Sequence, residues 1–221
     1  MIVERHGFKF NVRENTSDQC IIYEVFRARG GGDYRYMSLK CSDRVLDLGG
    51  NIGTYAMLIN NKVRNVVSFE PDKSNIELYE KNMVDNNINN CKVIPYAVIG
   101  NDDKERQFGL SNSINKGSHS LLVTKGKKRE VVTVPCMNIN DILNIGNFNK
   151  IKIDIEGSEY EVLKGIKSFK QIEEMIIEYH FNMIKEYYEE IQNLLKSNYN
   201  NVNVYKTPKG WNGIIHCFNV I

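Results

Sequence analysis

Short apolar runs that end in an acidic residue recur along the chain, and each is followed by a turn and an amphipathic stretch. The first two runs are VLD at residues 45–47 and VVSFE at residues 66–70. Apolar runs of this length, bounded by turn residues, predict strands that are buried on both faces. Similar runs predict three more strands, over residues 92–98, 151–155 and 174–179.

The stretches between these strands have the residue spacing of helices. One helix is predicted to begin near Thr54. Another is predicted to run from an N-cap at Ser74 to about Asn86, with Glu77 completing a capping box. After the fifth strand, one helical face gathers the apolar residues Ile184, Tyr187, Tyr188, Ile191, Leu194 and Leu195.

Strands that alternate with helices predict an α/β domain built on a doubly wound, mostly parallel sheet. With a C-terminal antiparallel hairpin over residues 202–205 and 214–220, we expect a Rossmann-like sheet of about seven strands. Two regions break the alternation. Residues 1–43 are predicted to form an N-terminal cap or lid on a catalytic domain over residues 44–221, and residues 100–138 an inserted hairpin near the substrate mouth.

The composition is that of an ordinary soluble domain, with 42% hydrophobic and 25% charged residues and a formal net charge of +2. This balance does not call for a polyanionic partner. The five cysteines form no C-x-x-C pair and the four histidines are scattered, so we assign no disulfide framework and no metal site. With no signal-peptide core and no apolar run long enough to cross a membrane, the expected location is the cytoplasm.

A glycine-rich turn, DLGGNIG at residues 47–53, follows the first strand. Gly49, Gly50 and Gly53 let the backbone approach a ligand, and N–H groups at the next helix start can receive a carboxylate. The spacing differs from the G-x-G-x-x-G of dinucleotide-binding folds. Because the turn offers an amino-acid-sized pocket instead of a pyrophosphate cradle, it favours S-adenosylmethionine over NAD.

Glu70 supplies the second half of a cofactor site. It ends the second strand, roughly twenty residues after the glycine turn, where an acid can accept hydrogen bonds from both ribose hydroxyls of an adenosine cofactor. A single acid at a strand end is usually a surface residue. The pairing of the turn with Glu70, each at a strand–turn–helix corner, is much more specific than either feature alone.

Acidic residues also follow the fourth strand, in the segment KIDIEGSE. Asp154 is expected beside the first strand, at the crevice where open α/β sheets bind ligands, and it can hold the methionine ammonium, a substrate hydroxyl or a metal ion. Glu156 shares its strand face. The alternative is a structural role, in which the carboxylate stabilises the N-terminus of the next helix. This alternative stays open for Glu156 and is the preferred interpretation for Glu159.

The fifth strand ends in Glu178-Tyr179-His180, which places Glu178 and His180 on one side of the strand. A histidine there is a candidate general base for a hydroxyl, and we group Asp154, Glu178 and His180 as the candidate catalytic residues. The competing interpretation is that His180 is a hydrogen-bonded structural residue.

Taken together, these segments resemble the FkbM-type methyltransferases. VLDLGGNIGTYA, VVSFEPD, KIDIEGSEYEVLKG and MIIEYH are similar to successive signatures of that family, as are NTSDQCIIYEVF and VTVPCMNINDIL, over roughly residues 15–182. The resemblance implies a class I methyltransferase fold and O-methylation of sugars, glycans or polyketide-like metabolites. It also implies a cofactor site lined by Asp47, Gly49, Asn51, Glu70 and Asp154; Gly50 departs from the alanine commoner in the family.

Other functions fit the sequence less well. The segment EGSE stands where a DNA amino-methyltransferase carries its Pro-Pro loop, and Cys136 lies before the fourth strand, where it is interpreted as a buried strand residue and not as a nucleophile. An RNA 2′-O-methyltransferase is suggested by the basic cluster Lys125, Lys127, Lys128 and Arg129, although such a run is usually a solvated loop. A domain that only binds the cofactor or a partner is the non-enzymatic alternative.

The expected reaction is direct, in-line methyl transfer to a hydroxyl, with no covalent enzyme intermediate. The expected acceptor is a small molecule or glycan, bound under a roof made by residues 1–43 and 100–138. Within that roof, Tyr34, Tyr36 and His119 are candidates for contact with a sugar-like acceptor, or else ordinary surface residues.

Overall fold

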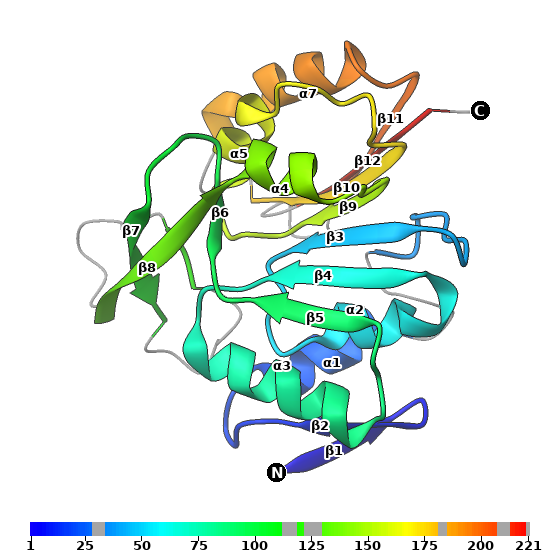
Figure 1. Cartoon of the computed structure of the whole chain (residues 1–221), viewed down its shortest axis with the longest axis vertical. Coiled ribbons are helices and arrows are strands. Elements are labelled where there is room, and N and C mark those ends of the chain that lie inside the picture. The colour runs from blue at the N-terminus through cyan, green and yellow to red at the C-terminus, as the bar shows by residue number, and fades with distance from the viewer. Residues whose placement is uncertain (28–33, 112–118, 122–129, 181–184, 207–212, 220–221) are drawn as a thin grey trace.

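The computed structural model describes residues 1–27, 34–111, 119–121, 130–180, 185–206 and 213–219. Its centre is a seven-stranded sheet of order β11-β12-β10-β9-β3-β4-β5 (Figure 1). The strands are β3 (Arg44–Leu48), β4 (Asn65–Phe69), β5 (Cys91–Ile94), β9 (Lys150–Ile153), β10 (Glu174–Tyr179), β11 (Asn201–Lys206) and β12 (Gly213–Phe218). The first five run parallel, and β12 lies antiparallel to both β10 and β11. The predicted mostly parallel sheet and terminal hairpin are confirmed.

The strand order reverses between β3 and β9. The chain passes from β3 to β4 and β5 on one side, and from β9 to β10 on the other. In such a sheet the connections leave a crevice at the carboxyl ends of the two central strands. The glycine turn after β3 and Asp154 after β9 both fall at this point.

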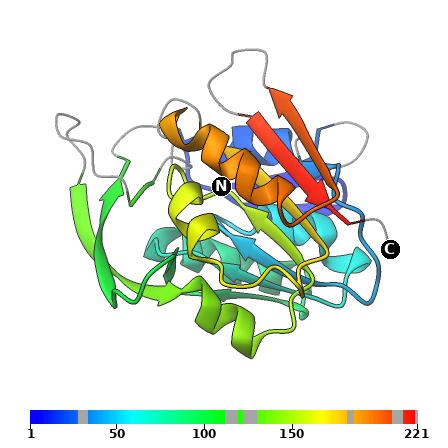
Figure 2. The ribbon, with the colours of Figure 1, turned by 90° about the horizontal axis from the view of Figure 1, so that it is seen from above.

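Helices cover both faces of the sheet (Figures 1 and 2). One layer holds α4 (Ile139–Ile145), α5 (Glu159–Gly165) and α7 (Tyr188–Lys196); the other holds α1 (Asp18–Val25), α2 (Thr54–Ile59) and α3 (Lys73–Asp85), with short 3-10 turns η2 (Asn60–Lys62) and η3 (Lys185–Tyr187). None of the helices in the described ranges has both the length and the apolar composition that crossing a membrane requires.

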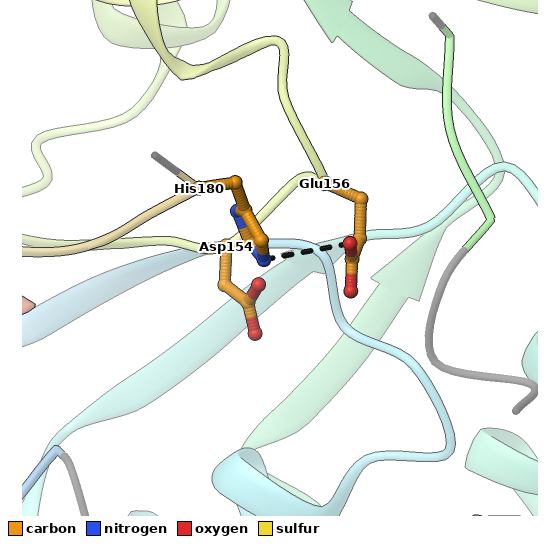
Figure 3. Close-up of side chains that lie close together, drawn as sticks. All are labelled: Asp154, Glu156 and His180. Carbon is orange, nitrogen blue, oxygen red and sulfur yellow. Dashed lines mark ion pairs between the residues drawn. The ribbon is translucent and has the colours of Figure 1, made fainter. Parts of the chain in front are cut away.

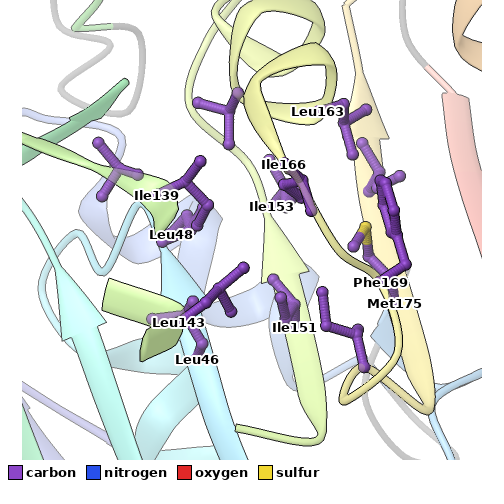
Figure 4. Packing of buried hydrophobic residues seen from close by; sticks show 14 of the residues in the cluster. Leu46, Leu48, Ile139, Leu143, Ile151, Ile153, Leu163, Ile166, Phe169 and Met175 are labelled. Carbon is purple, nitrogen blue, oxygen red and sulfur yellow. The ribbon is translucent and has the colours of Figure 1, made fainter. Parts of the chain in front are cut away.

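Each layer packs on its own hydrophobic core. Because side chains alternate along a strand, Leu46, Leu48 and Ile151 face the α4–α5–α7 layer (Figure 4), whereas Val45 and Val66 face the α1–α2–α3 layer. All five side chains are fully buried. The continuous apolar runs seen in the sequence are therefore the central strands of a sheet that is covered on both sides.

Two predicted boundaries are wrong. The strand expected over residues 92–98 stops at Ile94, because Pro95 has no N–H group to donate to a neighbouring strand. The chain resumes as β6 (Ala97–Ile99), which leaves the main sheet and pairs with β8. Helix α3 is capped by Asp72, not Ser74: the Asp72 backbone is extended and its carboxylate accepts a hydrogen bond from the Asn75 N–H.

Residues 100–138 contain the hairpin that was expected there. Strand β7 (Glu105–Leu110) pairs antiparallel with β8 (Glu130–Asn138), and β8 joins β6 in a small three-stranded sheet. In Figure 1 this sheet stands beside the carboxyl ends of β4 and β5. The basic cluster from Lys125 to Arg129 lies outside the described residues.

The N-terminal residues 1–27 form β1 (Ile2–Arg5), β2 (Phe8–Asn11) and α1, on the α2–α3 side of the sheet (Figure 1). Asn11 is held to α3 by Asn82 and Asp85. From Tyr34 onward the chain crosses the sheet, and the Ser38 N–H donates to the Glu174 carboxylate on β10. That residues 1–43 act as a lid stays a prediction.

Candidate active site

The crevice is closed at its base by Gly49 and Asp154. The Asp154 N–H donates to the Leu48 carbonyl at 3.0 Å, which extends the pairing of β9 with β3 by one residue. Gly49 has φ +87°, and a Cβ atom there would lie 1.8 Å from the Asp154 carbonyl oxygen. Both the left-handed backbone and the contact exclude any residue with a side chain at this position.

Glu70 lies at the opposite side of the same crevice. Its carboxylate accepts hydrogen bonds from the Asn51 N–H at 2.8 Å and the Asp72 N–H at 2.9 Å. Burial raises the pKa of Glu70 to about 7, even though these two N–H donors favour the ionised form. The site therefore holds an acid that changes charge near neutral pH and costs energy to ionise without a ligand.

Between these two ends lies a pocket of about 590 Å³, part of which is open to solvent. Its lining is Gly49, Asn51, Phe69, Glu70, Pro71, Asn75, Tyr96, Ala97, Val98, Phe108, His119, Leu121, Asp154, Ile155 and Glu156. Ligand-binding pockets combine apolar walls with a few polar groups. The apolar and aromatic residues, with Glu70 at one side and Asp154 at the other, fit the expected S-adenosylmethionine.

Of the residues expected to bind the cofactor, four line this pocket: Gly49, Asn51, Glu70 and Asp154. Gly53 is not among the residues that line the pocket. It is the N-cap of α2 and has a left-handed backbone conformation. A Cβ atom on Gly50 would come within 2.8 Å of the Ser68 side chain, so this glycine lets the turn pack on β4.

Asp47 is fully buried beneath the turn. It accepts a hydrogen bond from the Ser68 hydroxyl at 2.7 Å and pairs with the Lys152 ammonium at 3.1 Å. Burial raises the pKa of Asp47, and Lys152 opposes that rise. Its position is that of a support for the turn; that it contacts the cofactor stays a prediction.

Lys152 is a site residue to which sequence reasoning gave no role. Its ammonium donates to the Gly49 carbonyl at 2.8 Å and lies 3.1 Å from Asp47 and 3.6 Å from Asp154. Burial alone would lower the pKa of Lys152, but the two carboxylates outweigh it and raise the pKa above its ordinary value. The available signal was a lysine inside the apolar run IKIDI.

The hydroxyl of Tyr34 joins Asp154 to Glu178. It lies 2.7 Å from the Asp154 carboxylate and 2.9 Å from that of Glu178. Burial, with Asp154 nearby, raises the pKa of Glu178 to about 8. Tyr34 itself is buried, so it is not an ordinary surface residue, and contact with an acceptor stays a prediction.

His180 is held between two other acids, Glu159 and Glu156, and Figure 3 shows its ion pair with Glu156. Its Nδ1 lies 3.0 Å from Glu159, which is fully buried, and its Nε2 lies 3.4 Å from Glu156. Burial would lower the pKa of His180, but Glu159 and Glu156 outweigh it and raise the pKa to about 10. Glu159 also accepts the Gly157 N–H, so it orders the loop as well as the histidine.

The remaining residues singled out in the sequence lie in different parts of the structure. His119 lines the pocket, and its Nδ1 accepts a hydrogen bond from the Ser111 N–H. Tyr36 lies elsewhere, stacked on Tyr205 of β11 with ring centroids 3.9 Å apart. Cys136 is buried in β8, as its interpretation as a strand residue requires.

Comparison with known proteins places these features in a family. Residues 47–202 match the profile described as Methyltransferase FkbM domain. The chain is 28% identical over 188 residues to the hexuronic acid methyltransferase AglP of Haloferax volcanii, which covers 81% of this chain and 74% of that protein. It is 22% identical over 146 residues to Methyltransferase 1 of Beauveria bassiana, and the match covers 55% of this chain and 57% of that protein.

Solved structures share the fold at low identity. A candidate methyltransferase from Streptococcus mutans, in complex with SAH, matches with a TM-score of 0.52 at 10% identity and covers 82% of this chain and 91% of that chain. An rRNA methylase from Streptococcus thermophilus matches with a TM-score of 0.51 at 10% identity and covers 83% and 90%. The expected Rossmann-like methyltransferase fold is confirmed.

The Lys152–Asp47 pair gives a test of what holds the site together. Lys152→Met leaves Asp47 buried without its cation, and loss of one partner of a buried ion pair typically costs about 3–5 kcal/mol. Urea unfolding should show a loss of that order. Adding Asp47→Asn removes the stranded charge and should restore most of the stability, whereas Lys164→Met, at an exposed lysine, should change it little. A double variant no more stable than Lys152→Met would contradict this account.

Proposed function

The chain belongs to the FkbM family of methyltransferases, and on that premise we propose that it transfers a methyl group from S-adenosylmethionine to a hydroxyl of a sugar or glycan. The observation that carries the proposal is the pocket that begins at Glu70 and ends at Asp154. One end suits an adenosine cofactor. The other end gathers polar groups that suit a hydroxyl acceptor.

The cofactor end is formed by Glu70 and by the turn after β3. Glu70 would accept hydrogen bonds from the ribose hydroxyls, and the backbone at Gly49 and Asn51 would line the methionine part of the cofactor. S-adenosylmethionine supplies a methyl group already activated by the sulfonium. The protein then has to bind the acceptor, orient its oxygen and take up its proton.

At the acceptor end Asp154 lines the pocket, and Glu178 and His180 lie next to that lining through their contacts with Tyr34 and Glu156. Asp154 and Glu178 meet at the Tyr34 hydroxyl, and Glu159 orients the His180 ring. In the transfer, the acceptor oxygen forms a bond to the methyl carbon while the S–CH₃ bond breaks, and the hydroxyl proton passes to this group of side chains. S-adenosylhomocysteine leaves, and no covalent enzyme intermediate forms.

A sugar acceptor is supported by the similarity to a hexuronic acid methyltransferase. The similarity to an rRNA methylase is one of fold alone, at 10% identity, so it gives RNA no comparable support. The basic cluster that suggested RNA lies outside the described residues. RNA methylation and a non-catalytic binding domain are therefore outcomes that the experiments must distinguish.

Cofactor binding should depend on pH through Glu70. Because its pKa is raised to about 7 and the ionised form accepts the ribose hydroxyls, S-adenosylhomocysteine affinity should be highest above pH 8 and fall by up to about tenfold per pH unit below 7. Calorimetry from pH 6 to 8.5 measures this. Glu70→Gln should bind more weakly, without that pH dependence. Wild-type affinity that stays constant across the range would contradict the ribose assignment.

Acceptor identity can be tested with tritiated S-adenosylmethionine and three acceptor classes: uronic-acid glycosides, neutral glycosides and RNA. We expect methylation of a sugar and none of RNA. Glu178→Gln should lower kcat by about 10²-fold or more, as loss of a proton-transfer group does, with unchanged S-adenosylhomocysteine affinity. Glu189→Gln, an exposed acid on α7, is the control. Label on RNA alone would overturn the sugar proposal, and cofactor binding without transfer to any acceptor would favour a binding domain.

A further inference from the structure

Three side chains at the acceptor end form a set that metal ions bind. Asp154 and Glu156 each offer a carboxylate oxygen and His180 an imidazole nitrogen, and these atoms all lie within 4.8 Å of one another. Figure 3 shows the three side chains converging on one point. The residues come from the loop after β9 and the end of β10, so the fold, and not a local sequence motif, brings them together.

The histidine is oriented as metal-binding histidines usually are. Its Nδ1 lies 3.0 Å from Glu159, a carboxylate that is fully buried and also holds the Gly157 N–H. Histidines that bind metals almost always donate their second ring N–H to such a carboxylate or to a carbonyl. With Nδ1 as the donor, a metal ion that displaces the Nε2 proton would meet a lone pair directed toward Asp154 and Glu156.

The distance between His180 and Glu156 leaves room for both to bind one ion. Nε2 lies 3.4 Å from the Glu156 carboxylate. Adjacent ligand atoms at about 2.1 Å from an octahedral cation lie about 3 Å apart, so little movement is needed for both groups to reach one ion. The competing explanation is an ion pair between protonated His180 and Glu156, with no metal.

Glu156 is held in place by its backbone. It has φ +53°, a left-handed conformation that is rare for residues other than glycine, asparagine and aspartate. The Ser120 hydroxyl donates to its carbonyl at 2.6 Å and links this loop to the segment that follows β7. Glu156 lines the pocket, so an ion held there would lie beside the space proposed for the acceptor.

We propose that Asp154, Glu156 and His180 bind a divalent cation such as Mn²⁺ or Mg²⁺, which takes the acceptor hydroxyl as a further ligand. The proposal rests on the proposed function for the identity of that hydroxyl. Two carboxylates balance the charge of the ion, and one imidazole with two carboxylates leaves coordination positions for water or substrate. The bound ion would fix the acceptor oxygen and favour loss of its proton.

Binding of Mn²⁺ is measurable without any acceptor. Protein treated with EDTA is titrated with Mn²⁺ while the electron paramagnetic resonance signal of the free ion is followed. We expect one site, and a loss of affinity of about tenfold or more in Glu156→Gln, since removing even an outer partner of a metal costs that much. S-adenosylhomocysteine affinity, which checks the fold, should not change. Glu189→Gln is again the matched control.

A second measurement on the wild-type protein does not depend on any variant. Electron spin-echo spectra of bound Mn²⁺ should show coupling to an imidazole nitrogen, which comes from His180. Saturation without nitrogen coupling, affinity unchanged in Glu156→Gln, or no Mn²⁺ binding would each overturn the metal site. Sugar methylation that persists in EDTA, without Mn²⁺ binding, would leave the proposed function standing; Mn²⁺ binding without sugar methylation would leave only the metal site.

Discussion

The close approach of Gly49 to the backbone of Asp154 is the constraint on which the rest of the site depends. Two parallel strands, β3 and β9, end side by side, and the chain leaves them in opposite directions. With a Cβ atom only 1.8 Å from the Asp154 carbonyl oxygen, any other residue at position 49 would push the strand ends apart. The cofactor turn and the acceptor-side acid would then no longer face one pocket.

Buried charges keep this junction in register. The Lys152 ammonium donates to the Gly49 carbonyl and lies between Asp47 and Asp154, and Lys152 and Asp47 are almost fully buried. A second buried pair joins Lys150 and Glu174, the first residues of β9 and β10. Ion pairs this deeply buried add little net stability, but removal of one partner is strongly destabilising because it leaves an unpaired buried charge. They therefore favour one arrangement of strand ends over others.

The same charges connect the N-terminal segment to the sheet. Tyr34 contacts Asp154 and Glu178, and the Ser38 N–H binds Glu174. The segment that was expected to cover the site is thus attached at the residues proposed to act on the acceptor. A change in the ionisation of these carboxylates would alter both the proposed reaction and the packing of this segment on the sheet.

Much of this structure could be predicted from local pattern. Apolar runs located the central strands, and Gly49 and Glu70 could be placed in the pocket because each follows a strand directly. The strand predicted over residues 92–98 was wrong, although Pro95 was a signal for a break because it cannot donate to a neighbouring strand.

Pairings between distant residues could not be predicted. Tyr34 meets Glu178 across 144 residues, and Lys152 meets Gly49 across 103. His180 contacts Glu159 because the fold brings the start of α5 next to the end of β10. Local sequence carries no signal for contacts of this kind.

A crystal structure of the protein with S-adenosylhomocysteine would show whether the crevice between Gly49 and Asp154 holds the cofactor. We expect the ribose hydroxyls on the Glu70 carboxylate and the homocysteine part along the backbone at Gly49 and Asn51. Density for the ligand at any other edge of the sheet, or a ribose that makes no contact with Glu70, would contradict this expectation.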